Sequence, residues 1–162
     1  MLRAVEYADV VYEIIGAAME VHRKLNWGLL EPVYQEALHL ELLDRGIENE
    51  REKNIEIYYK NHHLDKSYKM DIVVGDVIVE LKSVTQLIAK HRAQLCNYLR
   101  LSRNPVGLLI NFGEEKLVGE RWVLDDKTNR CFLVDRNMLP IEDINYNKLF
   151  YCDPLEDELD KN

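Results

Sequence analysis

The centre of the chain reads Met70-Asp71-Ile72-Val73-Val74-Gly75-Asp76-Val77-Ile78-Val79-Glu80-Leu81-Lys82, two apolar runs joined by a Gly-Asp turn. Short runs of Val, Ile and Leu around such a turn predict a β-hairpin that enters a buried sheet. Because strand side chains alternate between faces, Glu80 and Lys82 are expected on the same face. Charged groups on a core strand are costly to bury unless they bind something. A functional site is therefore expected on this strand.

Two carboxylates and a lysine come together on this hairpin. Asp71 begins the first apolar run, and Glu80 and Lys82 end the second. Two carboxylates beside a lysine can hold a hard divalent ion and position a water molecule for hydrolysis. The pattern therefore predicts a hydrolytic metal site, and the alternative is a structural ion-pair cluster at a sheet edge.

Length and composition indicate an ordinary globular protein. The chain has 162 residues, 47% hydrophobic and 31% charged, which suits a single domain. No apolar run approaches the roughly 18 residues of a membrane span, and the first residues lack the build of a secretion signal. Three cysteines, Cys96, Cys131 and Cys152, form no Cys-x-x-Cys pair and fit small core residues in a reducing compartment. We therefore expect a cytoplasmic protein with no membrane partner.

The net charge of −8 argues against strong non-specific binding to nucleic acid, which depends on Lys and Arg. Half of that charge lies in the last ten residues, which carry five acids and one base. We expect residues 153–162 to form a solvated acidic tail after a single domain over residues 1–152.

Periodicity along the rest of the chain predicts alternating helices and strands. Helices are expected at about 6–25, 32–45 and 86–102 (the last capped by Thr85), and strands at 55–59, 64–74, 77–82, 106–112, 121–124 and 131–134. The last two are expected at sheet edges. This order predicts an α/β fold with a mixed central sheet flanked by helices, in which the strands on either side of the third helix run parallel through a right-handed crossover.

Five motifs stand in the order found in one bacterial family. They are residues 15–22, Gly28-Leu29-Leu30-Glu31-Pro32-Val33-Tyr34 (Gly-x-x-Glu-x-x-Tyr), Asp71, Glu80-Leu81-Lys82 and residues 94–99. With these motifs the chain resembles the bacterial GxxExxY proteins, a group of the PD-(D/E)XK nuclease superfamily with the restriction-endonuclease-like fold. The resemblance covers roughly residues 7–124. One position differs from the superfamily pattern: Met70 stands where the superfamily nominally has Pro before the Asp.

The resemblance implies a nuclease-like domain with an αβββαβ core and a metal site at the hairpin. It implies that Asp71 and Glu80 bind Mg²⁺ or Mn²⁺, helped by the Leu81 carbonyl. Lys82 then polarises the attacking water or stabilises charge on the phosphate. Gln94 matches the catalytic-site glutamine on the third helix.

Three more residues have two interpretations each. Glu31 either favours the dipole of its helix or, as an acid of the first helical region does in related nuclease folds, joins the metal cluster. His91 and Tyr98 share a helical stripe with Gln94, where packing explains them equally well. Gln94 is the better candidate for contacting the site or a phosphate, because a buried amide needs partners.

The expected activity is metal-dependent hydrolysis of a phosphodiester in nucleic acid, with DNA as the expected substrate. The alternative is a non-catalytic nucleic-acid- or protein-binding module on the same fold, favoured by the acidic balance and the lack of an evident basic channel. A homodimer is a further hypothesis, taken from the habits of small nuclease folds.

Overall fold

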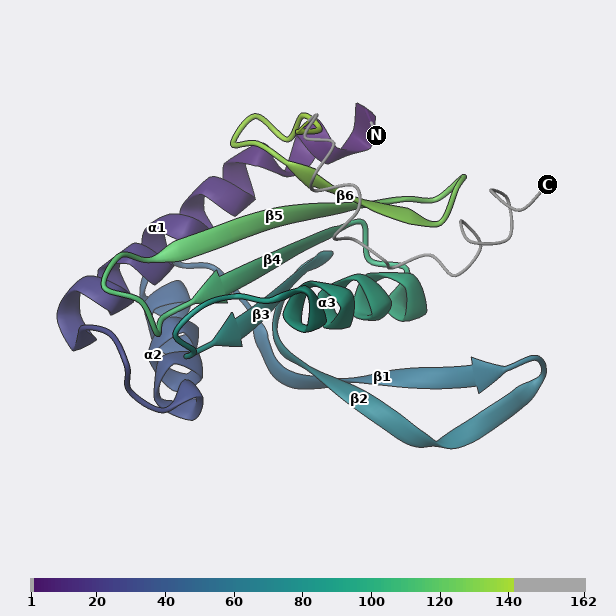
Figure 1. Cartoon of the computed structure of the whole chain (residues 1–162), viewed down its shortest axis with the longest axis horizontal. Coiled ribbons are helices and arrows are strands. Elements are labelled where there is room, and N and C mark those ends of the chain that lie inside the picture. The colour runs from purple at the N-terminus through teal and green to yellow at the C-terminus, as the bar shows by residue number, and fades with distance from the viewer. Residues whose placement is uncertain (1, 142–162) are drawn as a thin grey trace.

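The computed structural model describes residues 2–141 as one sheet with helices on both faces (Figure 1). The predicted acidic tail at 153–162, the domain boundary at 152 and Cys152 lie outside the described residues. No helix within residues 2–141 is long and apolar enough to cross a membrane. In chain order, the elements are the 3₁₀ helix η1 (Leu2–Tyr7), α1 (Ala8–Leu25), α2 (Glu31–Asp44), β1 (Glu50–Tyr59), β2 (His62–Val74), β3 (Val77–Lys82), α3 (Ala89–Ser102), β4 (Val106–Asn111), β5 (Val118–Asp125) and β6 (Arg130–Val134).

The six strands lie side by side in chain order, from β1 to β6. Every neighbouring pair is antiparallel except β3 and β4, which are parallel and joined through α3. A parallel pair needs such a crossover, because a tight turn can only reverse the chain. The mixed sheet flanked by helices confirms the predicted fold class, and the parallel pairing around the third helix is also as predicted.

Alternating side chains divide the core into two layers, one on each face of the sheet. Val79 and Leu81 of β3 pack with the apolar stripes of α1 and α2, whereas Ile78 packs with α3. On the α3 side, a Cβ atom at Gly107 of β4 would lie only 2.8 Å from a methyl carbon of Leu95. The missing side chain therefore lets α3 approach the parallel strands that carry the candidate site.

Three sequence predictions of local structure were wrong. The third helix begins at Ala89, not after Thr85, and the backbone of Val84 is held instead by two hydrogen bonds with the buried Asn111 side chain. β5 is longer than predicted and lies inside the sheet between β4 and β6, so only β6 forms that edge. β1 begins at Glu50, five residues before the predicted Ile55, because pairing with β2 extends a strand whose exposed charged residues show no apolar alternation.

Candidate active site

The predicted carboxylates occupy the place where β2 and β3 separate. Backbone pairing of the two strands ends at Ile72 and Val79. Beyond that point the two strands are joined by hydrogen bonds from backbone to side chain. The Asp71 amide donates to Glu80 Oε1 at 3.0 Å, and the Leu81 amide donates to Asp71 Oδ2 at 2.8 Å. These two amides would otherwise need partners from the ladder. The same carboxylates therefore close the strand pair and face each other at its end.

Burial of this pair disfavours its negative charge. Glu80 is only 3% exposed, and its burial followed by the nearby Asp71 charge holds its pKa well above the usual range. Burial also raises the pKa of Asp71, against the hydrogen bonds from Leu81 and Glu80 that lower it. Two buried carboxylates that lie close together repel each other, so one of them retains a proton more readily than a free carboxyl does. A cation bound between them relieves both costs.

Glu31 lies near this pair, at the first position of α2. The pKa of its half-buried carboxyl is raised first by burial and then by the Asp71 charge, and is lowered by Lys82. The interaction between two charges weakens with their separation, so these effects are those of charges that lie near one another. The structure thus brings Glu31, Asp71, Glu80 and Lys82 into one electrostatic group, although the helix dipole also favours an acid at this position.

The loop before α2 fixes the position of Glu31. The Gly28 amide donates to the carbonyl of Phe112 at 3.1 Å, and the Ser83 hydroxyl donates to the carbonyl of Leu29. Gly28 has a φ of 87°, a conformation that glycine adopts without strain. The loop is therefore fastened to the ends of β3 and β4, where the carboxylate pair lies.

Tyr34 contacts the loop before α2 and does not contact the carboxylate pair in any described hydrogen bond. Its hydroxyl donates to the carbonyl of Asn26 at 2.6 Å and accepts from the Leu29 amide at 3.0 Å. Its ring is fully buried and stacks on Phe112 with centroids 4.5 Å apart. Tyr34 therefore packs into the core and helps to hold the loop that carries Glu31.

Lys82 is held by the third helix. Its ammonium donates to Gln94 Oε1 at 2.8 Å, and Gln94 Nε2 donates to the Tyr98 hydroxyl at 2.9 Å. Across residues 2–141 Lys82 forms no ion pair within 4 Å. The ammonium therefore keeps donors for a substrate or water, since it has three and the glutamine takes one. His91 lies close enough for the Lys82 charge to help lower its pKa, after burial.

Gln35 was missed in the sequence. It is 8% exposed, and its Nε2 lies 3.5 Å from Asp71 Oδ1, while its Oε1 accepts from Arg51 Nη2 at 3.3 Å. The glutamine thus connects an arginine of β1 to the carboxylate. One signal was present: Gln35 stands four residues after Glu31 and so shares its helix face. The partner on β2 could not be read from that spacing.

The donor set fits a hard divalent cation in part. Carboxylate oxygens are the ligands that Mg²⁺ and Mn²⁺ prefer, and two of them meet here with a third nearby. Within residues 2–141 no three His, Cys, Asp or Glu residues are already arranged as a complete metal centre. The Leu81 amide contacts Asp71, and the metal role expected for its carbonyl stays a prediction.

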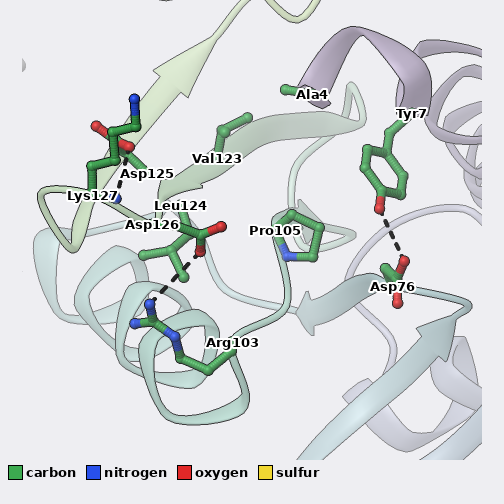
Figure 2. A pocket seen from close by; sticks show the side chains of 10 residues that line it. All are labelled: Ala4, Tyr7, Asp76, Arg103, Pro105, Val123, Leu124, Asp125, Asp126 and Lys127. Carbon is green, nitrogen blue, oxygen red and sulfur yellow. Dashed lines mark hydrogen bonds and ion pairs between the residues drawn. The ribbon is translucent and has the colours of Figure 1, made fainter. Parts of the chain in front are cut away.

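A pocket lies by the start of β3, at the opposite end of this strand from Glu80 and Lys82. It contains none of the predicted site residues (Figure 2). Some of its polar and charged groups contact one another. The Tyr7 hydroxyl donates to Asp76 Oδ2 at 2.9 Å, and Arg103 lies 3.7 Å from Asp126. Because most of its charged groups are exposed and none of the predicted site residues lines it, the pocket does not compete with the carboxylate pair as an active site.

The stability of the metal-free protein is expected to decrease as the pH rises from mildly acidic to neutral. Glu31, Asp71 and Glu80 have raised pKa values in the folded chain, so the folded state keeps protons that the unfolded state releases above about pH 4. Stability falls wherever the folded state binds more protons, and this loss is complete above the raised pKa values. Urea unfolding at several pH values measures it. Glu80→Gln, which stays neutral, should flatten this dependence, and an unchanged slope would contradict the raised pKa of Glu80.

Glu31→Gln distinguishes a metal ligand from a helix-dipole contact. If Glu31 joins the cluster, the variant should weaken Mn²⁺ binding on the order of tenfold or more, while metal-free stability changes by at most about 1 kcal/mol. Thermal melts with a Mn²⁺ titration measure both. Glu36→Gln, an exposed acid of the same helix, is the control and should leave Mn²⁺ binding unchanged. A Glu31→Gln protein with normal Mn²⁺ binding would assign Glu31 to the helix start alone.

Comparison with known proteins identifies the family of the chain. A family model described as PD-(D/E)XK nuclease superfamily matches residues 8–122, from the start of α1 into β5. The match spans both carboxylates, Lys82 and Gln94. The chain therefore belongs to the PD-(D/E)XK nuclease superfamily, and its mixed sheet is that of the restriction-endonuclease-like fold. Nucleases of this superfamily typically use divalent metals.

One solved structure, entitled "Crystal structure of SSO0001", is similar to this chain, with a TM-score of 0.48 and 18% sequence identity. The similarity covers 78% of this chain and 65% of the other, so the chain spans less than two thirds of that protein. A search of curated proteins finds no match.

Proposed function

We propose that this protein hydrolyses phosphodiester bonds in nucleic acid, with DNA as the expected substrate, in a reaction that depends on Mg²⁺ or Mn²⁺. The observation that carries the proposal is the juxtaposition of Asp71 and Glu80 at the end of a strand pair with a lysine that forms no ion pair among the described residues. Buried like charges are unfavourable for folding unless a ligand uses them. Membership of a nuclease superfamily supports the same conclusion.

The two carboxylates supply the ligand oxygens in this proposal. Asp71 is oriented by the Leu81 amide and Gln35, and Glu80 by the Asp71 amide. A divalent cation bound there would polarise the phosphate and lower the pKa of the attacking water. The raised pKa of Glu80 opposes this role at low pH, because cation binding and protonation compete for the same oxygens.

Lys82 supplies positive charge beside the carboxylates. Gln94 holds its ammonium through one hydrogen bond, which limits the positions that the flexible side chain can adopt. From there the ammonium can orient the attacking water, or donate to a phosphate oxygen whose negative charge increases in the transition state. Gln94 is thus a positioning residue, and Tyr98 supports it from the next turn of α3.

A nuclease assay on single- and double-stranded DNA and RNA tests the proposal. Cleavage is expected with Mg²⁺ or Mn²⁺ and not with EDTA. Glu80→Gln, prepared in parallel, is the control for contaminating nucleases, because it removes a ligand charge while keeping the Oε1 acceptor for Asp71. Metal-dependent cleavage lost in this variant supports the proposal. Binding of nucleic acid without cleavage by the wild type would favour the non-catalytic module instead.

We also propose a narrower placement in the GxxExxY group. Each named residue of that motif has its own structural role here. Gly28 has a left-handed φ, Glu31 begins α2 near the carboxylates, and the Tyr34 hydroxyl donates to the carbonyl of Asn26 in the loop before α2. One domain over residues 1–152 with an acidic tail at 153–162, a bacterial cytoplasmic location and a homodimer remain part of the same proposal.

A further inference from the structure

A pocket of about 640 Å³ opens beside Lys82, between α3 and the base of the β1–β2 hairpin. Figure 1 shows α3 lying beside this hairpin, which extends far beyond the rest of the sheet. Among the described residues that line the pocket none is acidic, although the chain as a whole carries a net charge of −8. The charged, polar and aromatic residues of its lining are Tyr68, Lys82, Lys90, His91, Gln94, Asn97 and Tyr98. Such a lining is suited to a negatively charged ligand.

The aromatic wall of this pocket is connected to the candidate active site. Tyr68 of β2 is 49% exposed, and its ring lies at a tilt to that of Tyr98, with centroids 5.4 Å apart. Tyr98 accepts from Gln94, which in turn accepts from the Lys82 ammonium. A ring held in this way has one side against α3 and much of its remaining surface open to solvent.

The other pocket residues can contact a phosphate backbone. Lys90 is exposed on the first turn of α3, and His91 lies beside it. His91 Nδ1 accepts from the Ile88 amide at 3.1 Å, so the remaining ring proton is on Nε2 and available as a donor. The pocket thus combines phosphate donors with an exposed aromatic ring, the two features by which proteins hold unpaired strands.

We propose that this pocket receives an unpaired nucleotide of a single-stranded nucleic acid, and that Tyr68 stacks on its base. Inside a duplex both faces of each base are covered by neighbouring bases, whereas an unpaired base can turn a face toward a side chain at the pocket wall. The proposal rests on the proposed nuclease function and names its substrate class: strands that are single or have single-stranded ends.

Fluorescence anisotropy with a labelled oligo(dT) of about 15 nucleotides tests the proposal in EDTA, where no cleavage occurs. Tyr68→Ala should weaken binding roughly 5- to 150-fold, the loss found when one base loses its aromatic partner. Tyr68→Phe should bind as the wild type does, because the ring is retained. Tyr12→Ala is the matched control, since Tyr12 is an exposed tyrosine of α1, away from the pocket, and should bind normally.

The results separate this proposal from the proposed function. Loss of oligo(dT) binding in Tyr68→Ala alone supports it, even if the wild type cleaves nothing with Mg²⁺ or Mn²⁺. Unchanged binding by Tyr68→Ala overturns it, even if metal-dependent cleavage is found. Equal or tighter binding of a blunt duplex of the same length by the wild type also overturns it. Circular dichroism confirms that each variant is folded before binding is compared.

Discussion

Lys82→Ala is expected to reduce metal-dependent cleavage roughly 100- to 1,000-fold, the loss typical of removing one donor that stabilises transition-state charge. The variant should fold normally, because Lys82 is only half-buried and the one described hydrogen bond of its side chain is to Gln94. Its response to Mn²⁺ in thermal melts should remain, since the ligand oxygens belong to Asp71 and Glu80. Single-turnover cleavage rates measure the effect on chemistry apart from product release.

Lys127→Ala is the control for this loss. Lys127 is an exposed lysine beside the pocket at the other end of β3, so its removal changes the net charge equally without touching the candidate site. Equal cleavage by wild type and Lys82→Ala would mean that the activity comes from a contaminant or that the chemistry lies elsewhere. A loss in Lys127→Ala as large as that in Lys82→Ala would indicate a general charge effect.

Asp71→Asn is expected to abolish both cleavage and the stabilisation produced by Mg²⁺ or Mn²⁺. At a free ion concentration about 100 times Kd, binding to the folded wild type adds about 2.7 kcal/mol, which corresponds to a Tm rise of roughly 5–10 °C for a chain of this size. The asparagine can still accept from the Leu81 amide, and it removes a charge that repels Glu80. The metal-free variant should therefore be as stable as the wild type or more so.

Asp76→Asn is the matched control for the metal response. Asp76 stands in the same hairpin, but at the turn, where it accepts from Tyr7 away from the carboxylate pair. Its variant should show the full rise in Tm with Mn²⁺, measured by calorimetry. A metal response that survives Asp71→Asn would place the ion at another site and remove the main support for the proposed chemistry.

Local patterns were enough to predict the hairpin and its charged residues. Strand alternation and the Gly75-Asp76 turn act within a few residues, so they can be read from the order of side chains alone. They predicted β3 with its bounds of Val77 to Lys82, as the structure has them. The general order of helices and strands followed from periodicity in the same way, and the structure has it.

Features that depend on partners distant in sequence could not be predicted. The Val84 backbone, which precedes α3, is held by the side chain of Asn111, 27 residues further along the chain. The connection from Arg51 through Gln35 to Asp71 joins β1, α2 and β2, and no spacing reveals it. Such contacts exist only after the layers have packed.

The candidate site shows the same division. Residue types and strand order placed Asp71, Glu80 and Lys82 near one another, because neighbouring strands bring them together. The raised pKa of Glu80 and the positions of Glu31 and Gln94 come from α2 and α3 packing around the end of the β2–β3 pair. Burial and charge proximity are properties of the packed chain, since a carboxyl has its ordinary pKa until other elements exclude water from it.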